Sequence, residues 1–391
     1  MSSINGIVDR DRKNTDFGVL REMGRATVLR GADQSGAYIN GNIGLYFNRF
    51  VGDGDEEARQ PYTVSFEGKN YTVMIDGDIK GDPRSCAEAV MECYLSFGYE
   101  CFSRFDGDFA LVISDEYRGE ILLARSRRSS RPLYYFLEKN KLIFSSEIKG
   151  ILRAVGGAVR LNEKKLQDHL FAPVGTYSGV DIYADINEIS QGKCLVVSEF
   201  GTRFFDCVSA SNDKEYGEDL IIPDVSISFD VRRILAESFI AFDIPQFDMF
   251  MPSVMNAIRA ESEKGKRAVR ITDGARKYSD SYIKEREDRL GGFFGVRFCS
   301  IYQNIESTDE SLYINLDSEL ERIVSACDTR VLEGLYGKGI VEKVRSERTI
   351  EARIRMTGML CQSEFLAHTQ PILLCSEEGT RDIYASRLST I

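Results

Sequence analysis

The chain has 391 residues, of which 43% are hydrophobic, and its net charge is −11 at pH 7. This length suffices for two domains with buried cores, so a disordered chain is excluded, and the negative charge disfavours nucleic acid and anionic membranes as partners. No apolar run approaches the roughly 20 residues that span a bilayer. Charged residues at positions 9–13 replace the apolar core of a signal peptide. We therefore expect a cytoplasmic protein with neither a nucleic-acid nor a membrane partner.

The first half of the chain is predicted to be rich in β-strands. Strand signals lie at Tyr71–Ile75, Phe109–Ile113, Gly119–Ala124, Lys141–Ser145 and Lys193–Val197. The first of these ends at Asp76-Gly77, a dipeptide typical of hairpin turns. Apolar residues at helical spacing predict helices at Thr15–Val28, Ser85–Phe97, Ser146–Val155 and Asn162–Phe171. Strands in the middle and helices outside indicate an α+β domain with stacked sheets.

The second half follows a different pattern. The polar segment Ser209–Asp219 has no apolar periodicity and is predicted to be a linker. Beyond it, helices are predicted at Phe229–Phe242, Phe250–Lys264, Asp317–Ala326 and Glu342–His368, and a strand at Ala268–Ile271. The predicted organisation is a first domain over 1–206, a linker over 207–224 and a second, mostly α domain over 225–391.

Cysteine and histidine usage limits the chemistry. Nine cysteines are scattered without a C-x-x-C pair, which argues against a disulfide framework and a zinc ribbon. We expect reduced, partly buried thiols. The two histidines, His169 and His368, are expected to be structural or surface residues. The sequence therefore predicts no metal and no cofactor.

Three smaller features have plain structural interpretations. The basic run at 125–131 is expected to be a solvated surface turn, and Asp106 and Asp108 are expected to flank a glycine turn beside a strand. Tyr134 and Tyr135 follow Pro132 and are expected to pack in the core.

Seven segments occur in an order typical of one family. They are RGADQSG (30–36), FNRF (47–50), MIDGDIKG (74–81), FDGDFALVISD (105–115), LLARSRRSSRPLYY (122–135), FSSEIKGIL (144–152) and VGTYSGVDIYADINEISQGKCLVV (174–197). Together they resemble the class II glutamine amidotransferase domain of asparagine synthetases, a member of the N-terminal-nucleophile hydrolases. The resemblance covers residues 1–206 and implies stacked antiparallel sheets flanked by helices.

The resemblance assigns a nucleophile to the start of the chain. In the family a cysteine follows the initiator Met, and after Met is removed its thiol attacks the glutamine amide, with its own α-amino group as the base. An α-amine suits this role because its pKa lies near 8. The corresponding residue here is Ser2, whose hydroxyl can act in the same way in principle but is a weaker nucleophile.

Three further positions of the family's glutamine site are implied. The Asn-Gly pair that stabilises the oxyanion corresponds to Asp76-Gly77, the aspartate that binds the substrate ammonium corresponds to Cys86, and the arginine that binds its carboxylate remains as Arg49. Arg49 is expected to hold a ligand carboxylate or to form a structural ion pair.

The exchange of Asn for Asp76 is adverse for catalysis. Losing one oxyanion donor costs about 2.7–4 kcal/mol. A carboxylate about 4 Å from the developing charge adds repulsion of up to about 4 kcal/mol at an effective dielectric near 20. A buried, protonated Asp76 would instead donate a hydrogen bond and restore the site.

The second half resembles a shortened synthetase domain. The family's S-G-G-x-D-S loop, which holds the pyrophosphate of ATP, is missing from the sequence. GKRAVRITDGARKYSDSY (265–282) resembles a later motif of the family, but Arg276 and Lys277 occupy the positions of its acidic pair. DRLGGFFGVRF (288–298) and INLDSELERI (314–323) resemble blocks that follow. ATP-dependent amide formation is therefore not expected.

These substitutions lead to three hypotheses. The first is a non-catalytic asparagine-synthetase-like protein with a binding, regulatory or scaffolding role, whose partner is an active homologue or a second copy. The second is a Ser2-dependent amidohydrolase that acts on an amide other than glutamine. The third is the family's own glutamine-dependent asparagine synthesis.

Overall fold

The computed structural model describes residues 2–11, 13–51, 59–79, 86–127, 129–156, 159–171, 180–207, 231–243, 245, 255, 259, 263, 268–269, 297–298, 316–369, 372–376 and 379–382. The chain forms two compact units. The first comprises the described residues up to Gly156, those from Ile186 to Cys207, and Arg297. The described part of 157–185 belongs instead to the second unit, with most of the later elements. Apart from Cys207, the predicted linker lies outside the described residues.

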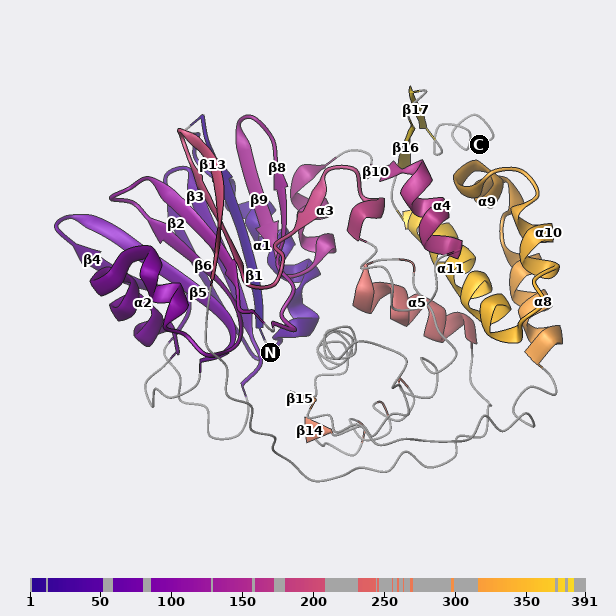
Figure 1. Cartoon of the computed structure of the whole chain (residues 1–391), viewed down its shortest axis with the longest axis horizontal. Helices are drawn as coiled ribbons and strands as arrows, with labels where there is room; N and C mark the ends of the chain where they lie inside the picture. The colour runs from indigo at the N-terminus through magenta and orange to yellow at the C-terminus, as the bar shows by residue number, and fades with distance from the viewer. Residues whose placement is uncertain are drawn as a thin grey trace. The chain divides into compact units, whose positions relative to one another are not determined.

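Two six-stranded antiparallel sheets form the first unit (Figure 1). The first sheet has the order β11-β8-β9-β1-β3-β2 and contains β1 (Ser2–Asp9), β2 (Gln34–Asn40), β3 (Ile43–Arg49), β8 (Tyr134–Leu137), β9 (Lys141–Ser145) and β11 (Ile186–Glu188). The second has the order β13-β12-β7-β6-β5-β4 and contains β4 (Tyr62–Phe66), β5 (Lys69–Ile79), β6 (Gly107–Asp115), β7 (Glu120–Arg125), β12 (Lys193–Ser198) and β13 (Gly201–Asp206). The antiparallel order places the start of β1 beside the end of β3.

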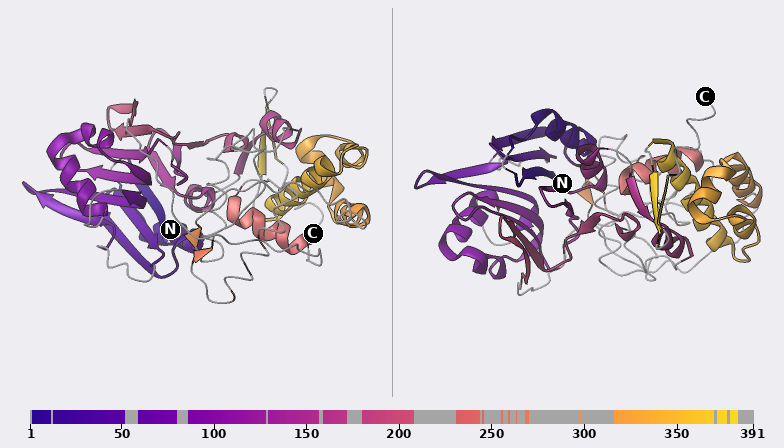
Figure 2. Two further views of the ribbon diagram at one scale, coloured as in Figure 1. Left: turned by 60° about the horizontal axis from the view of Figure 1, so that its bottom comes forward. Right: turned by 90° about the horizontal axis from the view of Figure 1, so that it is seen from above.

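Helices cover the outer faces of these sheets (Figure 2). α1 (Phe17–Ala26) and α3 (Ile148–Val155) pack on the first sheet, and α2 (Cys86–Phe97) packs on the second. Short 3-10 turns follow at η1 (Val28–Arg30) and η2 (Gly98–Ser103). α1 begins where the Asp16 carboxylate accepts the Gly18 N–H at 2.7 Å, which satisfies a backbone donor of its first turn.

The core of the first unit has two layers because strand side chains alternate between the faces of a sheet. Along β5, Val73 and Ile75 pack in the cluster under α2, whereas Met74 packs between the two sheets with Ile4 and Phe47. The predicted α+β class with stacked antiparallel sheets and flanking helices is confirmed.

The described residues of the second unit are mostly helical, as predicted. Its helices are α4 (Glu163–Phe171), η3 (Val180–Ile182), α5 (Val231–Phe242), α8 (Leu316–Ala326), α9 (Thr329–Tyr336), α10 (Ile340–Arg345) and α11 (Ile350–Thr369). A three-stranded sheet contains β10 (Val159–Asn162), β16 (Ile372–Ser376) and β17 (Gly379–Asp382). β14 (Ala268–Val269) and β15 (Arg297–Phe298) form a two-stranded sheet. Most of the predicted helix at 250–264 lies outside the described part of the chain.

Two predicted elements are wrong in detail. Asp76-Gly77 does not end a strand, since β5 continues through both residues, which pair with Ala110 and Phe109 of β6. The single helix predicted over Glu342–His368 is interrupted between α10 and α11, where the Thr349 hydroxyl accepts the Ala352 N–H at 3.4 Å. Across the helices that are described, none combines the length and apolarity of a membrane span.

Candidate functional site

The first residue of β1 meets a buried ion pair. The Ser2 backbone nitrogen donates to Oδ1 of Asp76 at 2.9 Å, which joins the two sheets of the first unit. Nη2 of Arg30 donates to Asp76 Oδ2 at 2.7 Å, and Nε of Arg30 donates to the Ser2 carbonyl at 3.0 Å. Both charged side chains are buried, with 1% of Arg30 and none of Asp76 exposed. Ser2, Arg30 and Asp76 therefore form one closed polar cluster.

This geometry assigns Asp76 as an acceptor. Each of its carboxylate oxygens receives an N–H, and one of the two donors is a guanidinium. An ionised carboxylate makes both bonds, whereas a protonated acid would have to turn one oxygen into a donor. The alternative of a neutral Asp76 that donates to an oxyanion thus has no support in these contacts. The adjacent Arg30 also neutralises part of the Asp76 charge, so the repulsion expected from the sequence is an upper bound.

Gly77 is held in a conformation that suits glycine. Its φ is +116°, and a Cβ at this position would lie 2.0 Å from the Asp108 carbonyl oxygen on β6. The close approach of β5 and β6 therefore requires a residue without a side chain. This requirement is structural and holds whether or not Gly77 contributes to an oxyanion site.

Arg49 lies beside Ser2. The two residues are paired across β1 and β3, and Arg49 is only 6% exposed. Its carbonyl accepts the Asp33 N–H at 3.1 Å, and the Asp33 carboxylate accepts the Val51 N–H at 2.9 Å. The RGADQSG segment thus packs against the end of β3, which positions Arg30 and Arg49 together at one end of the unit.

A network of neutral polar groups supports the start of β1 from behind. The Ser3 hydroxyl lies 2.9 Å from the Thr27 hydroxyl and accepts from Asn48 Nδ2 at 3.0 Å. Asn5 Nδ2 also donates to Thr27, at 2.9 Å. All four residues are almost fully buried. Because buried polar networks of this kind are rigid when satisfied, Ser2 is fixed by its neighbours.

The FSSE segment of the resemblance also serves β1. The Ser146 hydroxyl accepts the Ile4 N–H at 2.9 Å, and the Ser145 hydroxyl donates to Asn5 Oδ1 at 2.8 Å. These bonds join β1 to the end of β9. The segment therefore orders the strand that carries Ser2.

Cys86 stands at the first position of α2 and belongs to the apolar cluster beneath that helix. Its sulfur accepts the Ile79 N–H at 3.5 Å, which ties the helix start to the end of β5. The structure thus places Cys86 among core residues, whereas Ser2, Arg49, Asp76 and Gly77 come together at the strand ends. Its role as an altered ammonium site stays a prediction. Ser85, the predicted cap of α2, lies outside the described residues.

The basic run at 125–131 was wrongly predicted to be a solvated turn. Arg125 is 2% exposed and forms an ion pair with Glu188, and it donates to the Ile189 carbonyl at 2.8 Å. Arg131 approaches both Asp76 (4.0 Å) and Asp108 (3.9 Å). The run therefore brings a further guanidinium to the Asp76 cluster.

Asp108 belongs to β6 and holds this run in place. Its carboxylate accepts the backbone N–H of Ser130 at 2.8 Å and the Ser130 hydroxyl at 2.6 Å. Gly107 before it has φ of +150° and packs against Asp78, so the turn expected at this position opens directly into β6. Tyr134 is buried in the core as predicted, and Tyr135 packs against the cluster between the sheets.

Arg30 and Arg131 are the residues of this cluster that the sequence did not single out. Arg30 opens the RGADQSG segment, which was used for the resemblance without a role for its first residue. The available signal was the negative charge gained at position 76, where the family has a neutral Asn, since a buried carboxylate requires a cationic partner.

His169 is structural, as expected. It is 7% exposed, and its Nε2 lies 2.9 Å from the Pro245 carbonyl oxygen. Burial lowers the pKa of His169, because the charged imidazolium is disfavoured away from water.

Comparison with known proteins identifies the family. The family model described as glutamine amidotransferase domain matches residues 1–206. A Methanocaldococcus jannaschii protein assigned as glutamine-hydrolysing asparagine synthetase 2 is 26% identical over 267 residues, which cover 61% of this chain and 50% of the relative. Asparagine synthetase 3 of Bacillus subtilis is 24% identical over 200 residues, 47% of this chain and 33% of that protein. The chain thus matches half or less of the length of these relatives.

Among solved structures, the glutamine phosphoribosylpyrophosphate amidotransferase of B. subtilis aligns over 76% of this chain and 65% of its own, with 13% identity and a TM-score of 0.40. The family assignment depends on the sequence match over 1–206 and on its agreement with the order of the seven segments. The chain belongs to the glutamine amidotransferase domain family and is asparagine-synthetase-like.

Proposed function

We propose that this chain is a non-catalytic member of the family, and that its first unit binds a ligand or a partner without hydrolysing glutamine. The observation that carries the proposal is the Asp76 carboxylate, 2.9 Å from the Ser2 nitrogen and paired with the buried Arg30.

We expect the Ser2 nitrogen to be a poor base in either state of the N-terminus. If Met1 is retained, this nitrogen is an amide without basicity. If Met1 is removed, the new α-amine faces a carboxylate at hydrogen-bond distance, and a neighbouring opposite charge favours its protonated form. A protonated amine accepts no proton from the Ser2 hydroxyl, so the nucleophile stays inactive.

The electrostatics of the cluster add to this effect. The position that should stabilise an oxyanion carries an acceptor with both oxygens engaged, so one donor is lost, at a cost of about 2.7–4 kcal/mol. Because the Ser2 hydroxyl is also not activated, we expect the rate of glutamine hydrolysis through Ser2 to lie at background. The S-G-G-x-D-S phosphate loop is missing from the sequence, which argues against asparagine synthesis as well.

A binding role draws support from Arg30. Its Nη1 is buried and finds no acceptor within the part of the chain that the structure describes. Leaving a buried donor unsatisfied costs about 1–3 kcal/mol, so a hydrogen-bond acceptor bound at Arg30 Nη1 would be favoured. We propose a carboxylate ligand for this position, with an active synthetase homologue or a second copy of the chain as the macromolecular partner.

The activity assay uses the full-length protein with L-glutamine and measures glutamate release for the wild type and for Ser2→Ala. Intact mass establishes the state of Met1 in each preparation. We expect the two proteins to be equal at background. Glutamate release by the wild type that disappears in Ser2→Ala overturns the proposal. Release of ammonia from other amides that depends on Ser2 would establish the amidohydrolase instead.

The binding assay uses calorimetry with glutarate and, as the matched control, its diamide glutaramide, which lacks carboxylates. We expect glutarate to bind and glutaramide to bind at least about tenfold more weakly, because only the acid forms a charge-assisted bond with a guanidinium. Equal binding of both compounds, or of neither, contradicts the assigned ligand class.

A further inference from the structure

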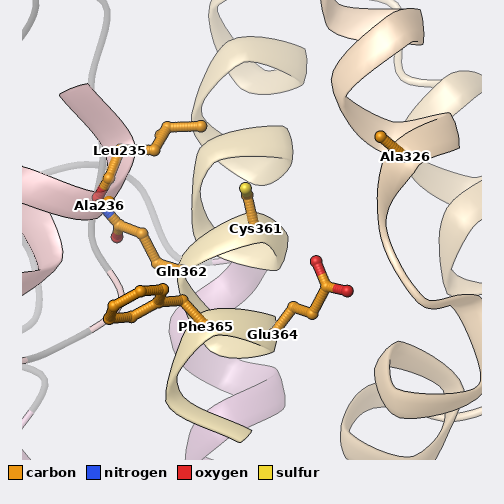
Figure 3. Close-up of a pocket in the computed structure, with 7 residues that line it drawn as sticks. All are labelled: Leu235, Ala236, Ala326, Cys361, Gln362, Glu364 and Phe365. Atoms are coloured by element: carbon orange, nitrogen blue, oxygen red, sulfur yellow. The ribbon is translucent and has the colours of Figure 1, made fainter. Parts of the chain in front are cut away.

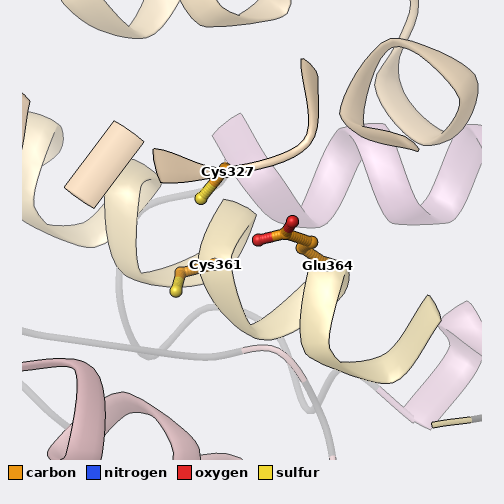
Figure 4. A group of neighbouring side chains, drawn as sticks. All are labelled: Cys327, Cys361 and Glu364. Atoms are coloured by element: carbon orange, nitrogen blue, oxygen red, sulfur yellow. The ribbon is translucent and has the colours of Figure 1, made fainter. Parts of the chain in front are cut away.

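A second cluster of reactive side chains lies in the second unit and takes no part in the site above. Cys327 directly follows α8, and Cys361 and Glu364 lie on α11. Their two sulfur atoms and one carboxylate oxygen all lie within 4.8 Å of one another. Figure 4 shows the three side chains on facing segments, with the Glu364 carboxylate toward Cys327.

The fold explains why these residues converge. Residues three apart on a helix share a face, so Cys361 and Glu364 project from the same side of α11, which packs against α8. Where α8 ends, the Cys327 N–H donates to the Val324 carbonyl at 3.2 Å, which turns the chain at this point. Cys327 is 8% exposed, and Cys361 is half-buried.

The carboxylate is oriented by a backbone donor. The Asp328 N–H donates to Oε1 of Glu364 at 2.7 Å. Ligand carboxylates in metal sites are held by outer hydrogen bonds of this kind. Asp328 itself caps α9 by accepting the Arg330 and Val331 N–H groups, so the donor is fixed in turn.

A cavity of about 240 Å³ adjoins the cluster (Figure 3). Cys361 and Glu364 line it from α11, Ala326 lines it from α8, and Leu235 and Ala236 line it from α5. The share of liquid volume of one water is about 30 Å³, so the cavity has room for a water beside the three side chains.

We propose that the second unit binds a zinc ion through Cys327 Sγ, Cys361 Sγ and a carboxylate oxygen of Glu364, with a water from the cavity as the fourth ligand. Two thiolates and one carboxylate suit a borderline-soft cation and disfavour Mg²⁺ and Ca²⁺, which prefer oxygen ligands alone. Tetrahedral zinc at about 2.3 Å from each sulfur requires sulfur atoms about 3.8 Å apart. Small rotations of side chains that already lie within 4.8 Å supply this spacing.

Binding must release protons. The ordinary pKa of a cysteine thiol lies near 8.5, so thiols predominate at neutral pH without a metal. Each thiol gives up its proton to solvent when its sulfur bonds to zinc, because only the thiolate is a ligand. One zinc ion therefore replaces two protons, and neither the metal nor sulfur changes its oxidation state.

The test uses the full-length protein, reduced and freed of metal with a chelator. Zinc is titrated by competition with a chromogenic chelator, and Co²⁺ is the spectroscopic probe. We expect one ion per chain and near-ultraviolet thiolate-to-cobalt bands that zinc removes. X-ray absorption at the zinc edge should show two sulfur neighbours at about 2.3 Å. Proton release into weak buffer should approach two per zinc.

Variants locate the site. Cys327→Ser and Cys361→Ser should each weaken zinc binding about a hundredfold or more, because they remove direct ligands, whereas loss of an outer partner alone costs about 10–100-fold. Glu364→Gln should keep the thiolate bands with weaker binding. Cys93→Ser removes a half-buried thiol of the first unit and is the matched control, with unchanged binding expected.

Three results would overturn the proposal. They are no stoichiometric zinc in the reduced wild type, a coordination shell with fewer than two sulfur atoms, and wild-type affinity in both Cys327→Ser and Cys361→Ser. Circular dichroism of each variant guards against loss of fold. If a variant unfolds, the number of protons released and the X-ray absorption spectrum of the wild type still test whether two thiolates bind zinc.

Discussion

The two units of this molecule differ in how deeply their ion pairs are buried. In the first, Arg30 and Asp76 are almost completely enclosed, and Arg125 is buried against Glu188. In the second, the ion pairs between described residues are at least partly exposed, such as Arg345–Glu321 with 39% and 47% of the side chains accessible. One of its deeply buried polar contacts, between the Tyr336 and Ser363 hydroxyls, is neutral.

Buried ion pairs rarely add net stability, because the cost of desolvation offsets their attraction. We therefore interpret the buried pair of the first unit by the groups that it holds in place. In the first unit the pair positions the Ser2 backbone. In the second, the partly exposed Arg345–Glu321 pair joins α10 to α8.

The largest effect is expected from removing one partner of the enclosed pair. Arg30→Met leaves the Asp76 carboxylate buried without its guanidinium, which should lower the free energy of unfolding of the first unit by about 3–5 kcal/mol. Denaturant titration with hydrogen exchange read separately on β1–β5 and α11 measures it. A loss below about 1 kcal/mol would contradict the expected cost of breaking this buried ion pair.

A smaller effect is expected at Gly77. Gly77→Ala should destabilise the first unit by at least about 1–3 kcal/mol, since the new Cβ meets the Asp108 carbonyl and φ is positive. Gly119→Ala is the matched control, because Gly119 has φ of +66° but nothing within 4 Å of its Cβ. Thermal unfolding of both variants separates the two effects, because Gly77→Ala combines backbone strain with a steric clash whereas Gly119→Ala has the strain alone. Equal losses of stability would contradict the close approach of β5 and β6.

The second unit should respond to acid through His169. The folded-state pKa of His169 is lowered by burial, so between that value and the unfolded value near 6.5 the unfolded state binds more protons. The free energy of unfolding should therefore fall as pH is lowered through this range and remain constant above it. Urea titrations between pH 5 and 8 measure this slope, and His169→Gln should flatten it. A slope that survives the substitution would assign the effect to another group.

The smallest effect is expected from the exposed pair. Arg345→Met should change the free energy of unfolding of the second unit by at most about 1 kcal/mol, because solvent screens both side chains. Measured beside Arg30→Met in the same denaturant series, it gives the contrast between the units directly. A loss as large as that of Arg30→Met would remove the contrast.

Much of the first unit was predictable because its local signals agree with its tertiary structure. Lys141–Ser145 is β9 with the predicted bounds, and the core of α2 follows its apolar spacing. The turn signal at Asp76-Gly77 failed because pairing with β6 over the whole of β5 outweighs the preference of a dipeptide. The prediction of a solvated turn at 125–131 failed because the acidic partners of this run lie elsewhere in the sequence, at Glu188, Asp76 and Asp108.

The candidate site was predictable in part. The resemblance placed Ser2, Arg49, Asp76 and Gly77 together, since these are the motif positions of a known order. The role of Arg30 could not be predicted, because the sequence does not show which cation pairs with the buried Asp76 carboxylate. Only the three-dimensional contacts identify it. The Cys327–Cys361–Glu364 cluster was beyond sequence reasoning, because 34 positions separate its two cysteines and no ligand spacing marks them.

The most direct measurement compares glutamine hydrolysis by Ser2→Cys with that by the double variant Ser2→Cys/Asp76→Asn. The first supplies the stronger nucleophile and keeps the carboxylate, and the second also restores the amide. If Asp76 disables the site, the double variant should be faster by about 100–1,000-fold, the value of one oxyanion donor. Rapid hydrolysis by Ser2→Cys alone, equal to that of the double variant, would contradict the account.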